Sequence, residues 1–174
     1  MRPPEQSKRE LVQQWMDKAA DDFGLAGYLL QEESPYQEAI CYHAQQAAEK
    51  YLKALLTWHD IQFPKTHDME TLLGLAEAAD PGISASLGPS VALSAYAVEL
   101  RYPDDRFEVD ARTAEEAVGL ASLVRERIVE LLSPAVGAQT HCFSPPLRSE
   151  SRPRAFRVPH YAFRSAHPAR SPWV

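Results

Sequence analysis

Five polar residues in the segment 43–57 have the spacing that places them on one narrow face of a helix. They recur at i, i+3, i+7, i+10 and i+14, which covers about 80° of the circumference of a helix. These residues are His43, Gln46, Lys50, Lys53 and Thr57. A histidine can act as a general base toward a hydroxyl, and a lysine can stabilise the charge that develops on a phosphate. His43 with Lys50 or Lys53 could supply both groups from this face, which we call the polar stripe.

The polar stripe also has a structural interpretation. On a helix that is buried elsewhere, such a face can simply be the solvated one, and Glu49 at its border would form an ordinary i, i+4 ion pair with Lys53. Arg101 could add a bidentate clamp for a phosphate. It also lies in a segment typical of a turn, where it would pair with an acid such as Glu99 or Asp105.

Two histidines raise further possibilities. His67 and Asp68 could form a pair in which the carboxylate fixes the tautomer of the imidazole, although a histidine near the start of a helix more often caps or packs.

Cys41 and His43 point about 200° apart on a helix, so we expect no metal site there. The chain has two cysteines, too few for a four-thiolate zinc site, and Cys41 is expected in the core. We expect neither metal nor cofactor.

Helices are the only regular elements that the sequence predicts. The polar stripe belongs to a helix over 35–60 whose apolar residues cover about 200°, which implies burial on more than one side. Apolar periodicity predicts further helices over 7–32, 67–79 and 113–132, and a weaker one over 84–100 that Gly88 and Pro89 interrupt. Thr66 and Thr113 are the expected caps, Thr113 in a capping box with Glu116. No strand pattern appears, so the fold class is all-α, an up-and-down bundle of four or five helices.

The charge changes along the chain. Residues 1–133 hold 12 Lys and Arg against 23 Asp and Glu, whereas residues 134–174 hold 6 Arg against one Glu and 7 of the 14 prolines. We therefore expect a helical domain over 1–133 and a disordered basic tail over 134–174, which could bind a partner, fold back on the acidic body or meet RNA. An acidic body binds phosphate backbones poorly, so any RNA contact must be local.

The sequence shows no secretory signal and no membrane span, and a cytoplasmic location is expected.

Three segments carry a family resemblance. CYHAQQAAEKYLKALL at 41–56, FPKTHDMETLLGL at 63–75 and ELRYPDDR at 99–106 resemble the HEPN family, the higher-eukaryote and prokaryote nucleotide-binding domain, in a match over about 8–133. The resemblance implies a small helical bundle that usually dimerises and is often encoded beside a minimal nucleotidyltransferase, in the manner of a toxin–antitoxin pair. Many members are metal-independent ribonuclease toxins, in which an R-x(4-6)-H motif from each protomer meets at the dimer cleft.

This chain departs from the ribonuclease motif. No histidine follows Arg101 in the required window, and the only match, from Arg154 to His160, lies in the proline-rich tail. We therefore expect a homodimeric module that binds nucleotide or RNA without cutting it and partners a nucleotidyltransferase. The alternatives are a ribonuclease with a non-standard site and a structural protein whose site has decayed. No catalytic residue is assigned, and the candidate ligand-binding residues are His43, Gln46, Lys50, Lys53, Arg101, His67 and Asp68.

Overall fold

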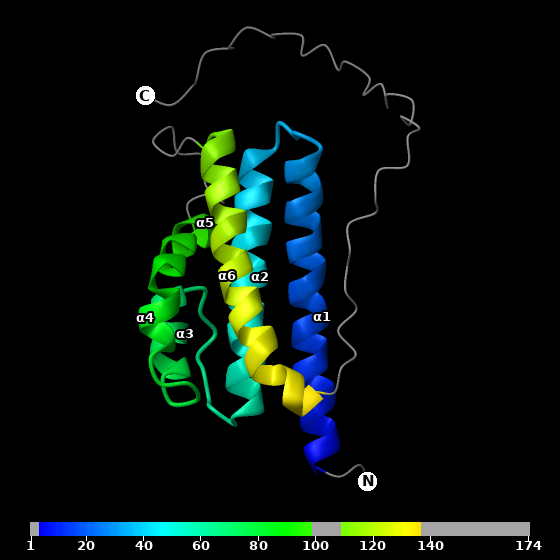
Figure 1. Ribbon diagram of the computed structural model, residues 1–174, viewed down its shortest axis with the longest axis vertical. Helices are drawn as coiled ribbons and strands as arrows, with labels where there is room; N and C mark the ends of the chain where they lie inside the picture. Colours follow the sequence, from blue (N-terminus) through cyan, green and yellow to red (C-terminus); the bar gives the residue numbers. More distant parts are fainter. Residues whose placement is uncertain (1–3, 99–108, 137–174) are drawn as a thin grey trace, which may run out of the picture. The chain divides into compact units, whose positions relative to one another are not determined.

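The computed structural model describes residues 4–98 and 109–136, so Arg101 and almost all of the predicted tail lie outside the described residues. Its elements are α1 (Pro4–Gln31), α2 (Gln37–Trp58), α3 (Met69–Ala76), α4 (Ile83–Leu87), the 3-10 helix η1 (Gly88–Leu93), α5 (Ser94–Val98) and α6 (Ala111–Val136). The residues described contain no strand. Figure 1 shows α1 rising, α2 returning, the chain climbing again through α4, η1 and α5, and α6 descending. The predicted all-α, up-and-down bundle is confirmed.

The central element is α2, which packs against α1, α6 and the short helices α3, η1 and α5. Its buried apolar residues lie on more than one side, as its wide apolar arc predicts: Ile40, Cys41, Ala44, Ala47, Ala48, Tyr51, Leu52, Ala54, Leu55 and Leu56. Burial raises the pKa of the Cys41 thiol to about 12, which leaves this cysteine an inert core residue. None of the helices in the described ranges is long and apolar enough to cross a membrane.

Two helices end in the same kind of turn. After α1, Ser34 donates to the carbonyl of Leu29, and after α2, Ile61 donates to that of Leu56. These 6→1 hydrogen bonds define Schellman motifs, which require a left-handed residue just past the helix. Glu33, with φ of 50°, and Asp60, with φ of 55°, take that position. The turn at Asp60 sends the chain back along α2 as the segment 61–67.

The helix starts differ from those predicted. Asp68, not Thr66, caps α3, because its carboxylate accepts the backbone N–H groups of Glu70 and Thr71. Asp110, not Thr113, caps α6, and its Oδ1 accepts the N–H of Thr113 at 2.8 Å. A carboxylate offers a charged acceptor to the positive end of the helix dipole, which explains why aspartate takes the cap in both places.

Several helix extents also differ from those predicted: α3, for example, covers only Met69–Ala76 of the predicted 67–79. The weak helix expected over 84–100 is divided into α4, η1 and α5, and Gly88 and Pro89 begin the 3-10 segment. At the other end, α6 continues to Val136, beyond residue 132 where the sequence predicts its end. The domain boundary at 133 stays a prediction.

Candidate functional site

The N-terminal half of the polar stripe is bound to α1 through one carboxylate. Asp22 of α1 accepts from His43 Nδ1 at 2.9 Å through Oδ1 and from Lys50 Nζ through Oδ2. Facing a carboxylate, Nδ1 of His43 must carry the proton. The side chains of Asp22 and Lys50 are 17% and 19% exposed. This half of the stripe therefore joins two helices and is not the solvated face that the structural interpretation expected.

The C-terminal half of the stripe contacts a buried carboxylate. Glu49 is only 3% exposed and accepts three hydrogen bonds, from Lys53 Nζ at 2.7 Å, from Gln45 Nε2 at 2.7 Å and from His67 Nδ1 at 2.9 Å. Burial acts to raise the pKa of Glu49, but these hydrogen bonds outweigh it and hold that pKa below its ordinary value of 4.5. Glu49 is thus an anion at neutral pH, and the pair with Lys53 is a buried one.

His67 has a different partner from the one predicted. Its Nδ1 binds Glu49, whereas Asp68 caps α3 and also accepts from the hydroxyl of Thr71 at 2.5 Å. Because Glu49 must receive a proton from Nδ1, the other ring nitrogen, Nε2, is left for a ligand. The side chain of His67 is 45% exposed.

Two glutamines connect the halves of the stripe. Lys50 donates to Gln46 Oε1 at 3.2 Å, Gln46 Nε2 donates to Gln45 Oε1 at 2.8 Å, and Gln45 in turn donates to Glu49. The result is a continuous chain of hydrogen bonds from Asp22 to His67. No buried side-chain nitrogen or oxygen in the described residues lacks a partner. We call this chain the polar network.

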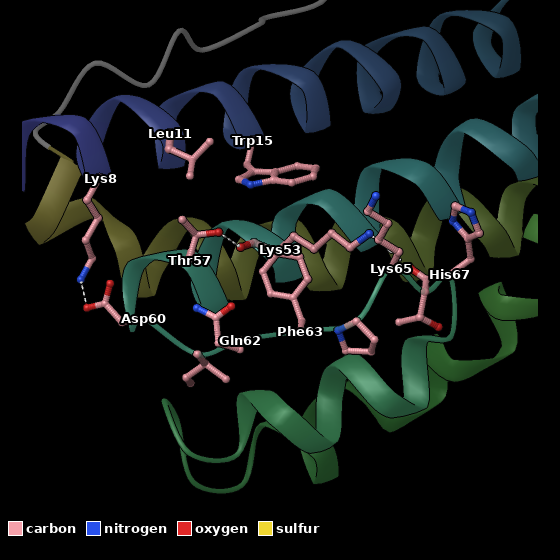
Figure 2. A pocket seen from close by; sticks show the side chains of 13 residues that line it. Lys8, Leu11, Trp15, Lys53, Thr57, Asp60, Gln62, Phe63, Lys65 and His67 are labelled. Carbon is pink, nitrogen blue, oxygen red and sulfur yellow. Dashed lines mark hydrogen bonds and ion pairs between the residues drawn. The ribbon is translucent and has the colours of Figure 1, made fainter. Parts of the chain in front are cut away.

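A cavity of about 670 Å³ opens at the end of the polar network formed by Lys53 and His67. It lies between α1, α2 and the segment 61–67 (Figure 2). Its lining includes Lys8, Leu11, Trp15, Lys53, Thr57, Asp60, Ile61, Gln62, Phe63, Pro64, Lys65, Thr66 and His67. Figure 2 shows Lys8 and Asp60 at one end, Lys53, Lys65 and His67 at the other, and Trp15 and Phe63 between them. We call this space the lysine–aromatic cavity.

Two aromatic rings form the middle of the cavity. Trp15 and Phe63 meet edge to face, with centroids 6.4 Å apart and planes at 69°. The ammonium of Lys53 lies 5.7 Å from the Trp15 centroid and 5.8 Å from that of Phe63. Both distances suit cation–π attraction. These contacts hold the rings in place, and thus the aromatic surface is formed before any ligand arrives.

Lysine side chains gather at the cavity although the domain is acidic. Three of the five lysines in the chain, Lys8, Lys53 and Lys65, line it. Lys8 forms an ion pair with Asp60, and Lys53 is paired with Glu49. Lys65 is exposed, and within the described part of the chain it has no ion-pair partner. Its charge is therefore free to meet an anion.

The candidate residues do not form one surface. His43, Gln46 and Lys50 belong to the end of the polar network near Asp22, while Lys53 and His67 lie at the cavity. Asp68 is a helix cap, and Arg101 lies outside the described residues. Within the described ranges, no group of three or more His, Cys, Asp and Glu could hold a metal ion.

Sequence reasoning missed several residues that complete the site: Lys8, Asp22, Gln45, Phe63 and Lys65. Asp22 and Lys8 lie on α1, and which residues of α1 meet α2 depends on how the two helices pack. Lys65 and Phe63 follow Asp60, whose left-handed turn directs the segment 61–67 back along α2. The only available signal was the high density of lysine, histidine and aromatic residues between 50 and 67.

Comparisons with known proteins agree with this architecture. The family model described as the HEPN domain matches residues 12–132. The crystal structure of an archaeal HEPN homologue superposes with a TM-score of 0.55 at 26% sequence identity, covering 68% of this chain and 95% of that chain. None of the curated proteins matches this chain.

Proposed function

Because the chain belongs to the HEPN domain family, we propose that it is a module that binds nucleotide or RNA without cutting it. The observation that carries the proposal is that both lysines of the polar stripe already have carboxylate partners, Lys50 with Asp22 and Lys53 with Glu49. No stripe cation is left beside His43 to stabilise the charge that cleavage develops. Lys65, by contrast, is available to bind a phosphate in its ground state.

Cleavage of RNA in the absence of metal tests this proposal. Purified protein is incubated with end-labelled tRNA in EDTA, beside the variants His43→Ala and His67→Ala, and each mixture is examined by filter binding and on a denaturing gel. We expect the wild-type protein to retain the RNA on the filter and leave it intact on the gel. Cleavage that either substitution abolishes would refute the non-cutting module.

One observation favours the alternative, a metal-independent ribonuclease with a non-standard site. His67 is oriented by the buried carboxylate of Glu49, and a histidine oriented in this way is a typical general base. Lys65, a lining residue of the same cavity, could supply the cation. Under this alternative the His67→Ala variant loses cleavage, whereas His43→Ala keeps it, and so the same gel separates the two candidate sites.

We also propose that the chain acts as a homodimer in the cytoplasm and partners a minimal nucleotidyltransferase. The family resemblance supports both interactions, and large apolar side chains such as Leu25, Tyr28 and Leu123 are exposed, as an interface would require. Light scattering should give twice the single-chain mass of 19.5 kDa. A nucleotidyltransferase encoded beside this chain should co-purify with it. A single-chain mass at high concentration, or failure to co-purify, would contradict the corresponding part.

A further inference from the structure

We propose that the lysine–aromatic cavity binds one nucleotide unit, its phosphate held by Lys65 and His67 and its base packed against Phe63 and Trp15. The inference rests on the proposed function and assigns it a location and an orientation. The unit is either a free nucleotide or one nucleotide of a single RNA strand, because both present the same phosphate, sugar and base.

The charges around the cavity indicate that the phosphate lies at the end that holds Lys65 and His67. Lys65 is exposed and has no ion-pair partner within the described ranges, and the partly exposed His67 binds Glu49 through Nδ1, which leaves Nε2 for a ligand. Protonation of His67 makes Nε2 a second donor toward the same anion. Lys53 lies at the same end, as Figure 2 shows, but its charge is balanced by Glu49, so Lys65 and His67 are the groups left for the phosphate. A phosphate placed here gains charge-assisted hydrogen bonds from at least two directions.

The pair of aromatic rings indicates where the base lies. Phe63 and Trp15 are fixed edge to face, and both belong to the cavity lining beside the side chains of Gln62 and Thr57. A flat base can pack on such rings whatever its identity, since every base has a π-face. We therefore expect weak discrimination among bases, with the amide of Gln62 as the group best suited to contact a base edge.

The opposite end of the cavity limits the length of the ligand. Asp60 is paired with Lys8 there, so the local charge at that end is close to neutral and gives no second phosphate site. Beyond the cavity the domain is strongly acidic, with 12 Lys and Arg against 23 Asp and Glu over residues 1–133. Further phosphates of a strand would meet this acidic surface and add no affinity, so one unit is held in the cavity and the salt dependence should correspond to about one or two phosphates.

Isothermal titration calorimetry on the full chain tests the proposal with defined probes. AMP and ATP carry base and phosphate, adenosine carries the base alone, and inorganic tripolyphosphate carries phosphate alone. A short single-stranded oligoadenylate and its duplex with oligouridylate complete the set and separate a free nucleotide from an RNA strand. We expect AMP or ATP to bind more tightly than either fragment, and the single strand to bind more tightly than the duplex.

Two pairs of variants assign the binding to the cavity. Lys65→Ala removes the unpaired cation, and Lys18→Ala makes the same change at an exposed position that does not line the cavity. Phe63→Leu removes a ring, and Tyr36→Leu removes one from a side chain that is exposed elsewhere. We expect Lys65→Ala to weaken AMP binding about tenfold, the loss typical of one charge-assisted hydrogen bond, and both control variants to bind as wild type. Thermal unfolding of each variant checks that it is folded.

The possible results separate this inference from the proposed function. If RNA or AMP binds but folded Lys65→Ala and Phe63→Leu proteins bind it as wild type does, the cavity assignment is wrong while the proposed function stands. If none of the probes binds the wild-type chain, both are wrong. If tripolyphosphate binds as tightly as ATP and Phe63→Leu has no effect, the site is one for phosphate alone, and the nucleotide assignment is overturned.

Discussion

Glu49 is the residue on which the polar network depends. Its carboxylate is buried and accepts from Lys53, Gln45 and His67. Lys53 is itself only 8% exposed, so loss of the Glu49 charge would leave a buried ammonium without a counter-ion. Such a loss is far more costly than breaking an exposed ion pair.

We predict that Glu49→Gln lowers the free energy of unfolding by about 3 kcal/mol at pH 7, the order expected when one partner of a buried ion pair is removed. Urea denaturation measures the change. Glu38→Gln on the same helix is the control, because Glu38 is exposed and its substitution should have little effect. Equal stability of wild type and Glu49→Gln would show that the buried pair contributes nothing.

The pH dependence of stability provides a second test at Glu49. The hydrogen bonds to Glu49 hold its pKa in the folded protein below its ordinary value of 4.5. The unfolded chain therefore takes up a proton at this residue before the folded one does, and the stability that Glu49 contributes is complete above about pH 4.5 and is lost as the pH falls further. We predict that denaturation curves from pH 7 to pH 3 fall less steeply for Glu49→Gln than for wild type. Parallel curves would contradict the pKa shift.

At individual residues, the sequence predicts which side chains share a helix face but not which distant residues they contact. The helical spacing predicted that His43, Lys50 and Lys53 share a face, because periodicity along one helix is a local property. The pair of Lys53 with Glu49 was predicted because it lies within the same helix. Asp22, the partner of His43 and Lys50, was not predictable because it reaches the stripe from α1 through tertiary packing. The unpaired charge of Lys65 likewise depends on which neighbours the fold brings near it.

At the scale of elements, Asp22 connects α1 to α2 by accepting from both His43 and Lys50. The three side chains are partly buried, so the pair of Asp22 with Lys50 should contribute more than an exposed surface pair. A double-mutant cycle isolates that contribution from the effect of each substitution alone.

We predict a coupling free energy of about 1 kcal/mol between Asp22→Asn and Lys50→Met, near the upper end for surface pairs. Chemical denaturation of the two single variants and the double variant provides the measurement. The exposed pair of Arg112 with Glu116, which lies along α6, is the matched control and should show little coupling. Equal coupling in the two cycles would mean that Asp22 does not hold the helices together.

The end of α1 offers a test of the backbone. Glu33 has a φ of 50°, in the left-handed region that costs an L-residue about 1 kcal/mol relative to glycine. We predict that Glu33→Gly raises the free energy of unfolding by about that amount. Glu32→Gly, at a neighbouring position without a positive φ, should lower it. Thermal and urea unfolding of both variants measure the changes, and destabilisation by Glu33→Gly would contradict the assigned turn.

The elements were predictable in proportion to the strength of their periodicity. The three long helices, α1, α2 and α6, follow from apolar spacing sustained over many turns. The segment 84–100 has a weak apolar pattern interrupted by Gly88 and Pro89, and the fold divides it into short pieces. The caps at Asp68 and Asp110 were missed because a neighbouring threonine was an equally reasonable candidate from sequence alone.

At the scale of the whole molecule, the sequence predicted the bundle and the family, and both were confirmed. The lysine–aromatic cavity was not predicted, because it forms only where α1, α2 and the segment 61–67 meet. Its three lysines contrast with the acidic domain around it. The molecule is therefore a helical bundle with one lysine-lined cavity, at which we propose that an anion binds.

Fluorescence anisotropy of a short, labelled single-stranded RNA in EDTA tests most directly the claim that this chain binds RNA or nucleotide without cutting it. Aliquots of the same sample are then run on a denaturing gel. We expect a saturable rise in anisotropy that excess ATP reverses, with the RNA still at full length on the gel. Shortened RNA, or an anisotropy that does not rise at any protein concentration, would contradict it.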